Sequence, residues 1–377
     1  MDDNDPSVPA NTPLINYALK GLEQCWLAQH RRWSYIYHLD GRAEPNESLP
    51  HSDVFYTLNV LLGFARVQQV PSGIDLRAVF DHNVAQLVTE PVPKYAFGMA
   101  LWAAAELGLQ LPAHILKVIE AMLLDRQNWR TFRAQDLGMM LSGIVAQAKV
   151  DPQPWSKLAG ELSNFLIDRY SWPSGLFGDA PYGVRRRFAS FASQTYLTLA
   201  CYMYGEFAGD RRFIDTANSC ARTLIALQGP NGEWPWFFDA PSGSVLDFYE
   251  VYSVHQYGMA PAFLEFAERH GVPGAREALV RGFMWVLGSN QLKRPMLMPN
   301  LHLTIRSQLR KHELRTKKIR MLRATKNLLL RREADLIDPA GIRLRLECRS
   351  YELGWILWSF GQRFDLPNLT NHRDFSE

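Results

Sequence analysis

KYAFGMALWAAAELG (residues 94–108) is the stretch that decides the fold of this chain of 377 residues. Apolar and small residues fill almost every position, which predicts a helix that is buried on most of its sides. Gly98, in the middle of the stretch, lowers helix propensity by about 1 kcal/mol relative to alanine but allows a neighbouring helix to approach closely. The stretch therefore predicts a helix in a crowded core.

The same pattern recurs along the chain, with a leucine or aromatic residue, a glycine, and a methionine or tryptophan leading into small and apolar residues. The repeats are RAQDLGMMLSGIVAQA (133–148), SVHQYGMAPAFLEFAERHG (253–271) and RSYELGWILWSFGQRF (349–364). Two more apolar stretches, 52–65 and 193–209, fit the same role without a glycine at that place. Six more amphipathic helices are predicted between these stretches, at 14–29, 75–88, 113–125, 154–169, 211–227 and 275–290.

Strict alternation of six apolar helices with six half-polar ones predicts an all-α protein, a single (α/α)6 toroid with an inner and an outer ring. In this organisation the toroid covers residues 14–365, with a disordered tail at 1–13 and a second tail at 366–377. The chain resembles the (α/α)6 toroids of carbohydrate-active enzymes, which include six-hairpin glycosidases, unsaturated glucuronyl hydrolases, sugar 2-epimerases and toroidal polysaccharide lyases. This resemblance implies a substrate cleft at the rim where the inner helices begin.

Composition and motifs exclude several other classes. With 47% hydrophobic and 21% charged residues, the chain is neither disordered nor a disulfide scaffold, and its four cysteines lie singly, without the spacing of a zinc site. We expect no metal and no cofactor, since phosphate-loop, dinucleotide and HExxH motifs are missing from the sequence. The acidic N-terminus does not read as a signal peptide, and no apolar run reaches about 18 residues, so a cytoplasmic protein is expected.

A basic segment interrupts the repeat before the last inner helix. Residues 291–346 carry 15 Lys and Arg against 4 Asp and Glu, although the net charge of the whole chain is only +3. We expect a helical insertion or lid here. Its middle, 305–333, mixes leucines with cations in a pattern that suits a helix on an anionic surface, whether bilayer, polyanionic glycan or partner protein. The alternative is a lid packed on the body with its cations in water. A nucleic-acid partner is not expected, because the segment has few aromatic residues for stacking.

Polar residues cluster at the predicted starts of the inner helices and in two similar loops, WPSGLFGDAPYG (172–183) and WPWFFDAPSG (234–243). Carboxylates and histidine supply acid/base chemistry, and arginines pair with anionic groups. The candidate catalytic residues are His255, Asp239, Glu250, Asp136 and Glu352. The candidate substrate-binding residues are Trp234, Trp236, Asp179, Arg186, Arg187, Asp53, Gln194, Gln256, Tyr249, Arg349 and Tyr351.

These observations favour an enzyme that acts on an oligosaccharide or polysaccharide, more specifically an anionic one that contains uronate. Hydrolysis, β-elimination and epimerisation all stay open, because sequence does not give the distance between carboxylates. One alternative is a terpenoid-type cyclase with an apolar aromatic cavity, although its DDxxD and DxDD motifs are missing from the sequence. Another is a non-catalytic glycan-binding scaffold held at the periphery of a membrane through residues 305–333.

Overall fold

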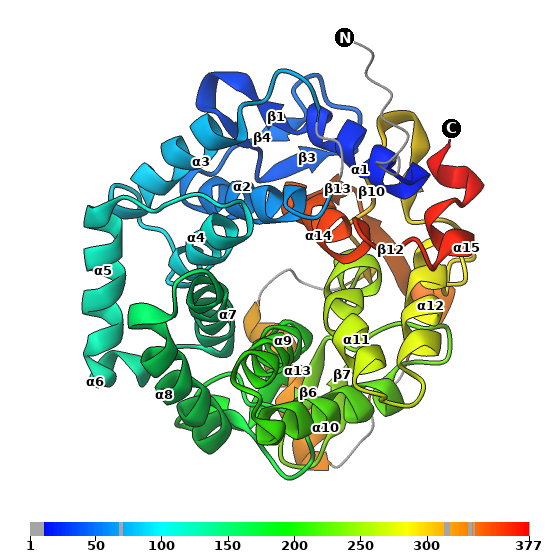
Figure 1. Cartoon of the computed structure of the whole chain (residues 1–377). Helices are drawn as coiled ribbons and strands as arrows, with labels where there is room; N and C mark the ends of the chain where they lie inside the picture. Colours follow the sequence, from blue (N-terminus) through cyan, green and yellow to red (C-terminus); the bar gives the residue numbers. More distant parts are fainter. Residues whose placement is uncertain (1–10, 68–70, 313–316, 331–333, 335, 377) are drawn as a thin grey trace.

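The computed structural model shows a closed ring of helices in two layers (Figure 1). It describes residues 11–67, 71–312, 317–330, 334 and 336–376, and for residues 317–321 the backbone alone. The inner helices are α2 (Pro50–Phe64), α4 (Tyr95–Glu106), α7 (Ala134–Val150), α9 (Phe191–Ala208), α11 (Ala260–Arg269) and α14 (Ser350–Phe360). The outer helices are α1 (Pro13–Gln24), α3 (Leu76–Ala85), α5 (Ala113–Leu124), α8 (Pro152–Tyr170), α10 (Arg211–Leu227) and α12 (Ala275–Val286). The predicted (α/α)6 toroid is therefore confirmed.

Each inner helix packs against the next, and α14 closes the ring by packing against both α11 and α2. Close approach depends on glycine at the seam between α4 and α7. A methyl group at Gly98 would collide with the backbone of Met139 and Met140, and one at Gly143 would collide with the carbonyl of Gly98. These glycines bring the two helices nearer than any side chain would allow.

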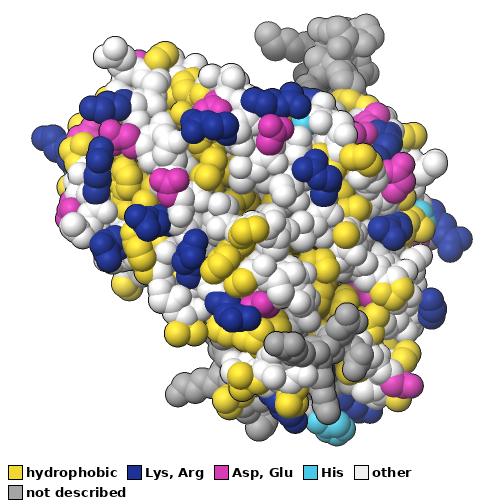
Figure 2. Space-filling model, turned by 90° about the horizontal axis from the view of Figure 1, so that it is seen from below, with side chains coloured by type: hydrophobic (Ala, Val, Ile, Leu, Met, Phe, Trp, Pro, Cys, Tyr) yellow, Lys and Arg dark blue, Asp and Glu magenta, His cyan; other side chains and the backbone are white. Residues whose placement is uncertain are grey.

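The outer helices keep one face in water. In α10, Phe213, Ala217, Cys220 and Leu224 are buried at helical spacing, while arginines on the opposite face are exposed. On the outer wall drawn in Figure 2, positive, negative and hydrophobic side chains are interspersed over the surface. The four cysteines are all buried and unbridged.

Short strands lie in the loops at the rim where the inner helices begin. They are β1 (Trp26–Leu27), β2 (Arg32–Trp33), β3 (Ile36–His38), β4 (Asn46–Glu47), β5 (Phe188–Ser190), β6 (Phe237–Asp239), β7 (Ser244–Asp247), β8 (Val251–Tyr252), β9 (Leu297–Met298), β10 (Leu303–Thr304), β11 (Ser307–Arg310), β12 (Ile342–Arg345) and β13 (Glu347–Cys348). Every pair of these strands is antiparallel, and the three-stranded sheets are β5-β6-β7, β12-β11-β8 and β13-β3-β4.

The basic insertion is only partly helical. Helix α13 (Lys317–Leu330) lies within it, but strands flank this helix on both sides. Strand β11 pairs with β12 and also with β8, so Ser307 stands opposite Tyr252. The insertion is thus joined to the rim by backbone hydrogen bonds, and the expected helix over 305–333 is replaced by a strand at its beginning.

The two expected tails have different outcomes. Residues 1–10 lie outside the described residues, and α1 begins at Pro13, capped by the Thr12 side chain. The segment from 366 onward contains α15 (Pro367–Thr370) and buries Phe375 against Tyr17, with ring centroids 5.3 Å apart. No described helix combines the length and hydropathy needed to cross a bilayer.

Candidate active site

A cleft with a volume of about 380 Å³ lies at the rim where the inner helices begin. Residues from the first two turns of α2 and α9, from the first turns of α4, α7 and α14, and from the turn that precedes α11 reach it. Its lining consists of Phe55, Tyr56, Tyr95, Arg133, Gln135, Asp179, Arg185, Ser190, Ala192, Ser193, Tyr196, Trp236, Tyr252, His255, Met259, Arg306 and Tyr351. A mixture of aromatic rings with a few converging polar groups is typical of a small-molecule or glycan site.

Asp179 comes from the first of the two Asp-Ala-Pro loops. Its Oδ1 atom accepts hydrogen bonds from the backbone N–H of Ser190 (2.8 Å) and from the Oγ atoms of Ser190 (3.2 Å) and Ser193 (2.5 Å). Within the described part of the chain, its Oδ2 atom accepts no hydrogen bond. Burial raises the pKa of Asp179 above its usual range, an effect that the serine hydrogen bonds and Arg185 only partly offset. The side chain is therefore held in place and retains one free oxygen for a ligand.

His255 lies in a π-helical turn, His255–Met259, at the start of α11. Its ring packs against Phe191 and Tyr252, with centroids 4.6 and 5.1 Å away, and it makes no hydrogen bond to a described residue. Burial, and then the nearby positive charge of Arg306, lower the pKa of His255 to about 3. The imidazole is therefore neutral near pH 7 and can accept a proton.

Three arginines give the cleft a positive potential. Arg133 and Arg185 are exposed and make no ion pair with a described residue. Arg306, from the insertion, bonds to Glu352 and lies 3.3 Å from Glu347, with its guanidinium 5.1 Å from the centre of the Tyr252 ring. Two guanidinium groups without an ion pair to a described residue, and a third fixed by carboxylates, suit the binding of an anionic ligand.

Aromatic rings form much of the remaining wall. Tyr56 packs on Tyr351 with centroids 4.5 Å apart, and Phe55 packs on Tyr95 at 4.6 Å. Burial raises the pKa of Tyr95 and of Tyr351 to about 12, so both phenols stay protonated and can donate hydrogen bonds. Rings with hydroxyl groups can pack on the apolar faces of sugars while bonding to their oxygens.

Four of the predicted site residues line this cleft: His255, Asp179, Trp236 and Tyr351. Asp179 was predicted to bind substrate and not to act in catalysis. It is nevertheless the only Asp or Glu among the described lining residues, so it is the candidate for acid chemistry. Four other lining residues were not among the predicted site residues: Tyr56, Tyr196, Tyr252 and Arg306. Arg306 was counted with the surface cations, and only the pairing of β11 with β8 brings it to the rim.

The four other predicted catalytic carboxylates are not among the described lining residues of the cleft, and each is bound to a neighbouring group. Asp136 accepts from the backbone N–H groups of Arg133 and Tyr95, and Glu352 is held by Arg306 and Tyr257. Asp239 pairs with Arg187 at 2.6 Å in the second Asp-Ala-Pro loop. Glu250 is held by Ser307 and, at 3.1 Å, by Arg345. Burial raises the pKa of Glu352 to about 7.

Eight of the predicted binding residues are likewise not among the described lining residues of the cleft, and each is buried or bonded to a neighbouring residue. Trp234 is fully buried between Phe191 and Phe263, so it cannot serve as a sugar platform. The remaining seven point into packed loops or pair locally: Gln194 bonds to the backbone of Phe177, Gln256 to Tyr252, Asp53 to Ser48 and Leu49, Tyr249 to Ile337, Arg186 to Arg169, Arg187 to Asp239 and Arg349 to Glu347.

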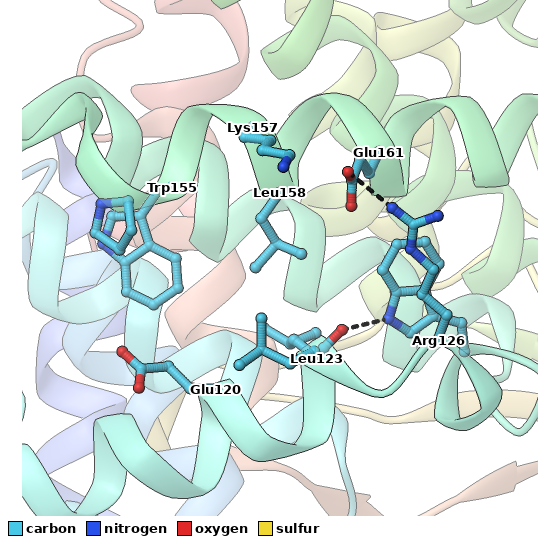
Figure 3. A pocket seen from close by; sticks show the side chains of 10 residues that line it. Glu120, Leu123, Arg126, Trp155, Lys157, Leu158 and Glu161 are labelled. Atoms are coloured by element: carbon cyan, nitrogen blue, oxygen red, sulfur yellow. Dashed lines mark hydrogen bonds and ion pairs between the residues drawn. The ribbon is translucent and has the colours of Figure 1, made fainter.

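A second pocket, of about 410 Å³, lies on the outer wall between α5 and α8 (Figure 3). Leu123 and Leu158 approach each other across it, and Arg126 at its edge is paired with Glu161 at 2.8 Å. This pocket is mainly apolar and lies away from the helix starts. The rim cleft, which combines an acid, a histidine and arginines, is the better candidate for catalysis.

Comparison with known proteins supports the fold. No protein-family model matches the chain, and no curated protein matches its sequence. Among solved structures, cellobiose 2-epimerase from Bacillus thermoamylovorans has a TM-score of 0.62 at 9% identity, covering 93% of this chain and 99% of its own. An unsaturated glucuronyl hydrolase specific for heparin gives 0.59 at 14%, covering 95% and 98%. An α-1,6-mannanase from Salegentibacter gives 0.58 at 13%, covering 93% and 98%. This chain thus shares its (α/α)6 toroid with carbohydrate-active enzymes along nearly its whole length.

Proposed function

We propose that this protein is an enzyme that binds a uronate-containing oligosaccharide in the rim cleft and removes a proton from the sugar. The observation that carries the proposal is the meeting of Asp179, His255 and three arginines in one aromatic-walled cleft. The solved structures with the same toroid include proteins that act on sugars or bind mannose oligosaccharides, which agrees with a glycan substrate.

In the proposed reaction, neutral His255 takes the proton from the carbon next to the uronate carboxylate. The electron pair of the broken C–H bond moves toward the carboxylate, and the arginine charges stabilise the enolate-like anion that forms. Asp179, whose raised pKa favours the protonated form, then supplies a proton. If this proton goes to the glycosidic oxygen as its bond to carbon breaks, the result is β-elimination. If it returns to the opposite face of the same carbon, the result is epimerisation.

Substrate binding itself activates His255 in this scheme. The positive charge of Arg306 is one cause of the low pKa of His255. A carboxylate bound beside Arg306 offsets that charge, so the pKa of the imidazole rises and its basicity increases. The cleft therefore provides a stronger base when the anionic substrate is present.

Two other reactions fit the cleft less well. Glycosidic hydrolysis by the usual mechanism needs a pair of carboxyl groups, one on each side of the bond. Asp179 is the only residue with a carboxyl group among the described lining residues of the cleft. A terpenoid-type cyclase needs an apolar cavity, and three arginines and an aspartate contradict that requirement.

The test is incubation of the purified full chain with uronate-containing and neutral oligosaccharides in D2O, followed by mass spectrometry. Cleavage without addition of water, giving an unsaturated uronate, or deuterium gain without cleavage, supports the proposal. Addition of water across the bond would identify a hydrolase instead, and binding without any change of mass would identify a glycan-binding scaffold.

The two similar loops provide a matched pair of variants for the same assay. Asp179→Asn should abolish most of the turnover, whereas Asp239→Asn, in the second Asp-Ala-Pro loop, should change turnover per folded molecule by less than about threefold. Equal losses in both variants would show that Asp179 acts only through the structure of its loop.

A further inference from the structure

Helix α13 rests on the rim through one of its faces. Ala324 is fully buried in a small cluster with Phe188, Phe237 and Leu246. Next to it, the Asn327 side chain donates a hydrogen bond to the carbonyl of Leu246 (3.0 Å), and the Arg323 guanidinium lies 3.8 Å from Asp247. These contacts fix which side of the helix faces the protein.

The opposite side of α13 carries three leucines and a lysine in water. Leu322, Leu329 and Leu330 have exposed fractions of 69%, 76% and 50%, and Lys326 is also exposed. These four residues, spaced i, i+4, i+7 and i+8, form one stripe, which we name the α13 outer face. Exposed leucines gathered on one side of a surface helix indicate an interaction site.

The sequence around this face is strongly basic. Residues 305–333 contain eleven Lys and Arg against two Asp and Glu, and three of these cations, Arg306, Arg310 and Arg323, lie within 4 Å of carboxylates of the rim. The rest of the chain outside residues 291–346 is acidic overall, so the positive charge is concentrated in this segment of the sequence. The partner of this face must therefore satisfy both apolar and cationic groups.

We propose that the α13 outer face docks on the surface of an anionic lipid bilayer. At such a surface the leucines can enter the boundary between head groups and acyl chains while lysine and arginine bind lipid phosphates. A soluble polyanion, such as an acidic glycan or a nucleic acid, would pair with the cations but would leave the leucines in water. Charge and apolar exposure together therefore favour the bilayer.

Docking in this way brings the candidate active site near the membrane. Trp236, which lines the cleft, packs against the same small cluster as Ala324 and Leu328 of α13. An α-helix is about 10–12 Å across, so the wall of the cleft would lie about one helix diameter from the lipid surface. Membrane docking of this kind is independent of the reaction that the cleft performs.

The test is flotation of the full chain with vesicles of phosphatidylcholine, with and without phosphatidylglycerol. We expect the protein to float with the anionic vesicles and to remain in solution with phosphatidylcholine alone. The double variant Leu322→Glu/Leu329→Glu should bind the anionic vesicles at least about tenfold more weakly. The matched control is Leu124→Glu/Val150→Glu, which makes the same change of charge at two other exposed positions, 76% and 69% exposed.

Three results would overturn the proposal. The parent protein could fail to float with either kind of vesicle. Both double variants could lose binding equally, which would show that net charge alone acts. Alternatively, sedimentation velocity could reveal a dimer that only the α13 variant dissociates while the parent does not float, which would assign the face to a second copy of the chain. Circular dichroism and thermal unfolding of each variant establish that it is folded.

Discussion

Asp179 combines features that support catalysis with features that reduce stability. Its half-buried carboxyl group has a raised pKa because of desolvation, so its ionisation opposes folding. Its contribution to stability is complete below the unfolded-state pKa and is lost as pH rises through the folded-state pKa. Asn keeps the Oδ1 acceptor that Ser190 and Ser193 use, and it removes the charge. We therefore expect Asp179→Asn to lower turnover by about 10²–10⁴-fold and to raise Tm, more at pH 8 than at pH 5.

Activity on a uronate oligosaccharide and calorimetry at the two pH values measure both effects on the same preparation. A variant that loses activity and also loses stability at every pH would contradict this account. It would show that Asp179 is mainly a structural acceptor for the start of α9.

The contribution of His255 to stability is lost as pH falls, whereas that of Asp179 is lost as pH rises. Its folded-state pKa, about 3, lies below the unfolded value of about 6.5. The stabilising contribution of His255 is therefore complete above pH 6.5 and is lost as pH falls toward 3. The reason is that the imidazole takes up a proton at a higher pH in the unfolded chain than in the folded one. Between pH 7 and 5 this histidine alone should reduce the free energy of unfolding by about 2 kcal/mol. Urea unfolding of the parent and of His255→Gln at both pH values measures this contribution, and an identical pH dependence in the two proteins would contradict it.

At the scale of elements, the glycine of the opening stretch has a clear expected effect. In α4, Gly98→Ala improves helix propensity but places a methyl group against the backbone of α7, so a loss of about 1–3 kcal/mol is expected. Gly160 in the outer helix α8 is the control, because a methyl group there meets only the tip of the Tyr204 side chain at 3.1 Å. Gly160→Ala should be neutral or stabilise by up to about 1 kcal/mol. Thermal unfolding of the two variants, side by side, compares these effects, and equal shifts in Tm would exclude close helix packing as the cause.

The helices could be predicted from the sequence, whereas the strand pairing at the rim could not. Inner and outer helices differ in periodicity within about 15 residues, so all twelve helices could be predicted. The positions of Asp179, His255, Trp236 and Tyr351 at the rim followed from the helix starts and loops, whereas their roles stay predictions. Strand β11 depends on pairing with β8, which lies more than fifty residues earlier in the chain. The local sequence around β11 does not indicate which segment it pairs with. For this reason Arg306 was missed. Trp234 was misassigned for a related reason, since a loop tryptophan that is buried and one that is exposed look alike in sequence.

At the scale of the whole molecule, ring closure is what creates the cleft. Asp179, His255 and Tyr351 are far apart in the chain, and they line one cleft because the inner helices begin at the same rim of the ring. An open arc of hairpins would separate Tyr351 on α14 from Tyr56 on α2, whose rings now pack 4.5 Å apart. The site should therefore form only when the ring is complete.

Truncation of the chain tests this dependence directly. A chain that ends at Arg349 lacks α14, so α2 and α11 each lose an inner neighbour and Trp355 and Trp358 leave the core. We expect this chain to lose its cooperative thermal transition, because no remaining element can cover both exposed seams. A chain that ends at Asp365 keeps α14 and loses only α15 and the Phe375 contact, so it should unfold in one transition at a Tm lower by about 2–8 °C. Circular dichroism and tryptophan fluorescence followed together would show whether each transition is single. If the shorter chain unfolded cooperatively near the parent Tm, the hairpins would be largely independent, and closure would serve the cleft without stabilising the fold.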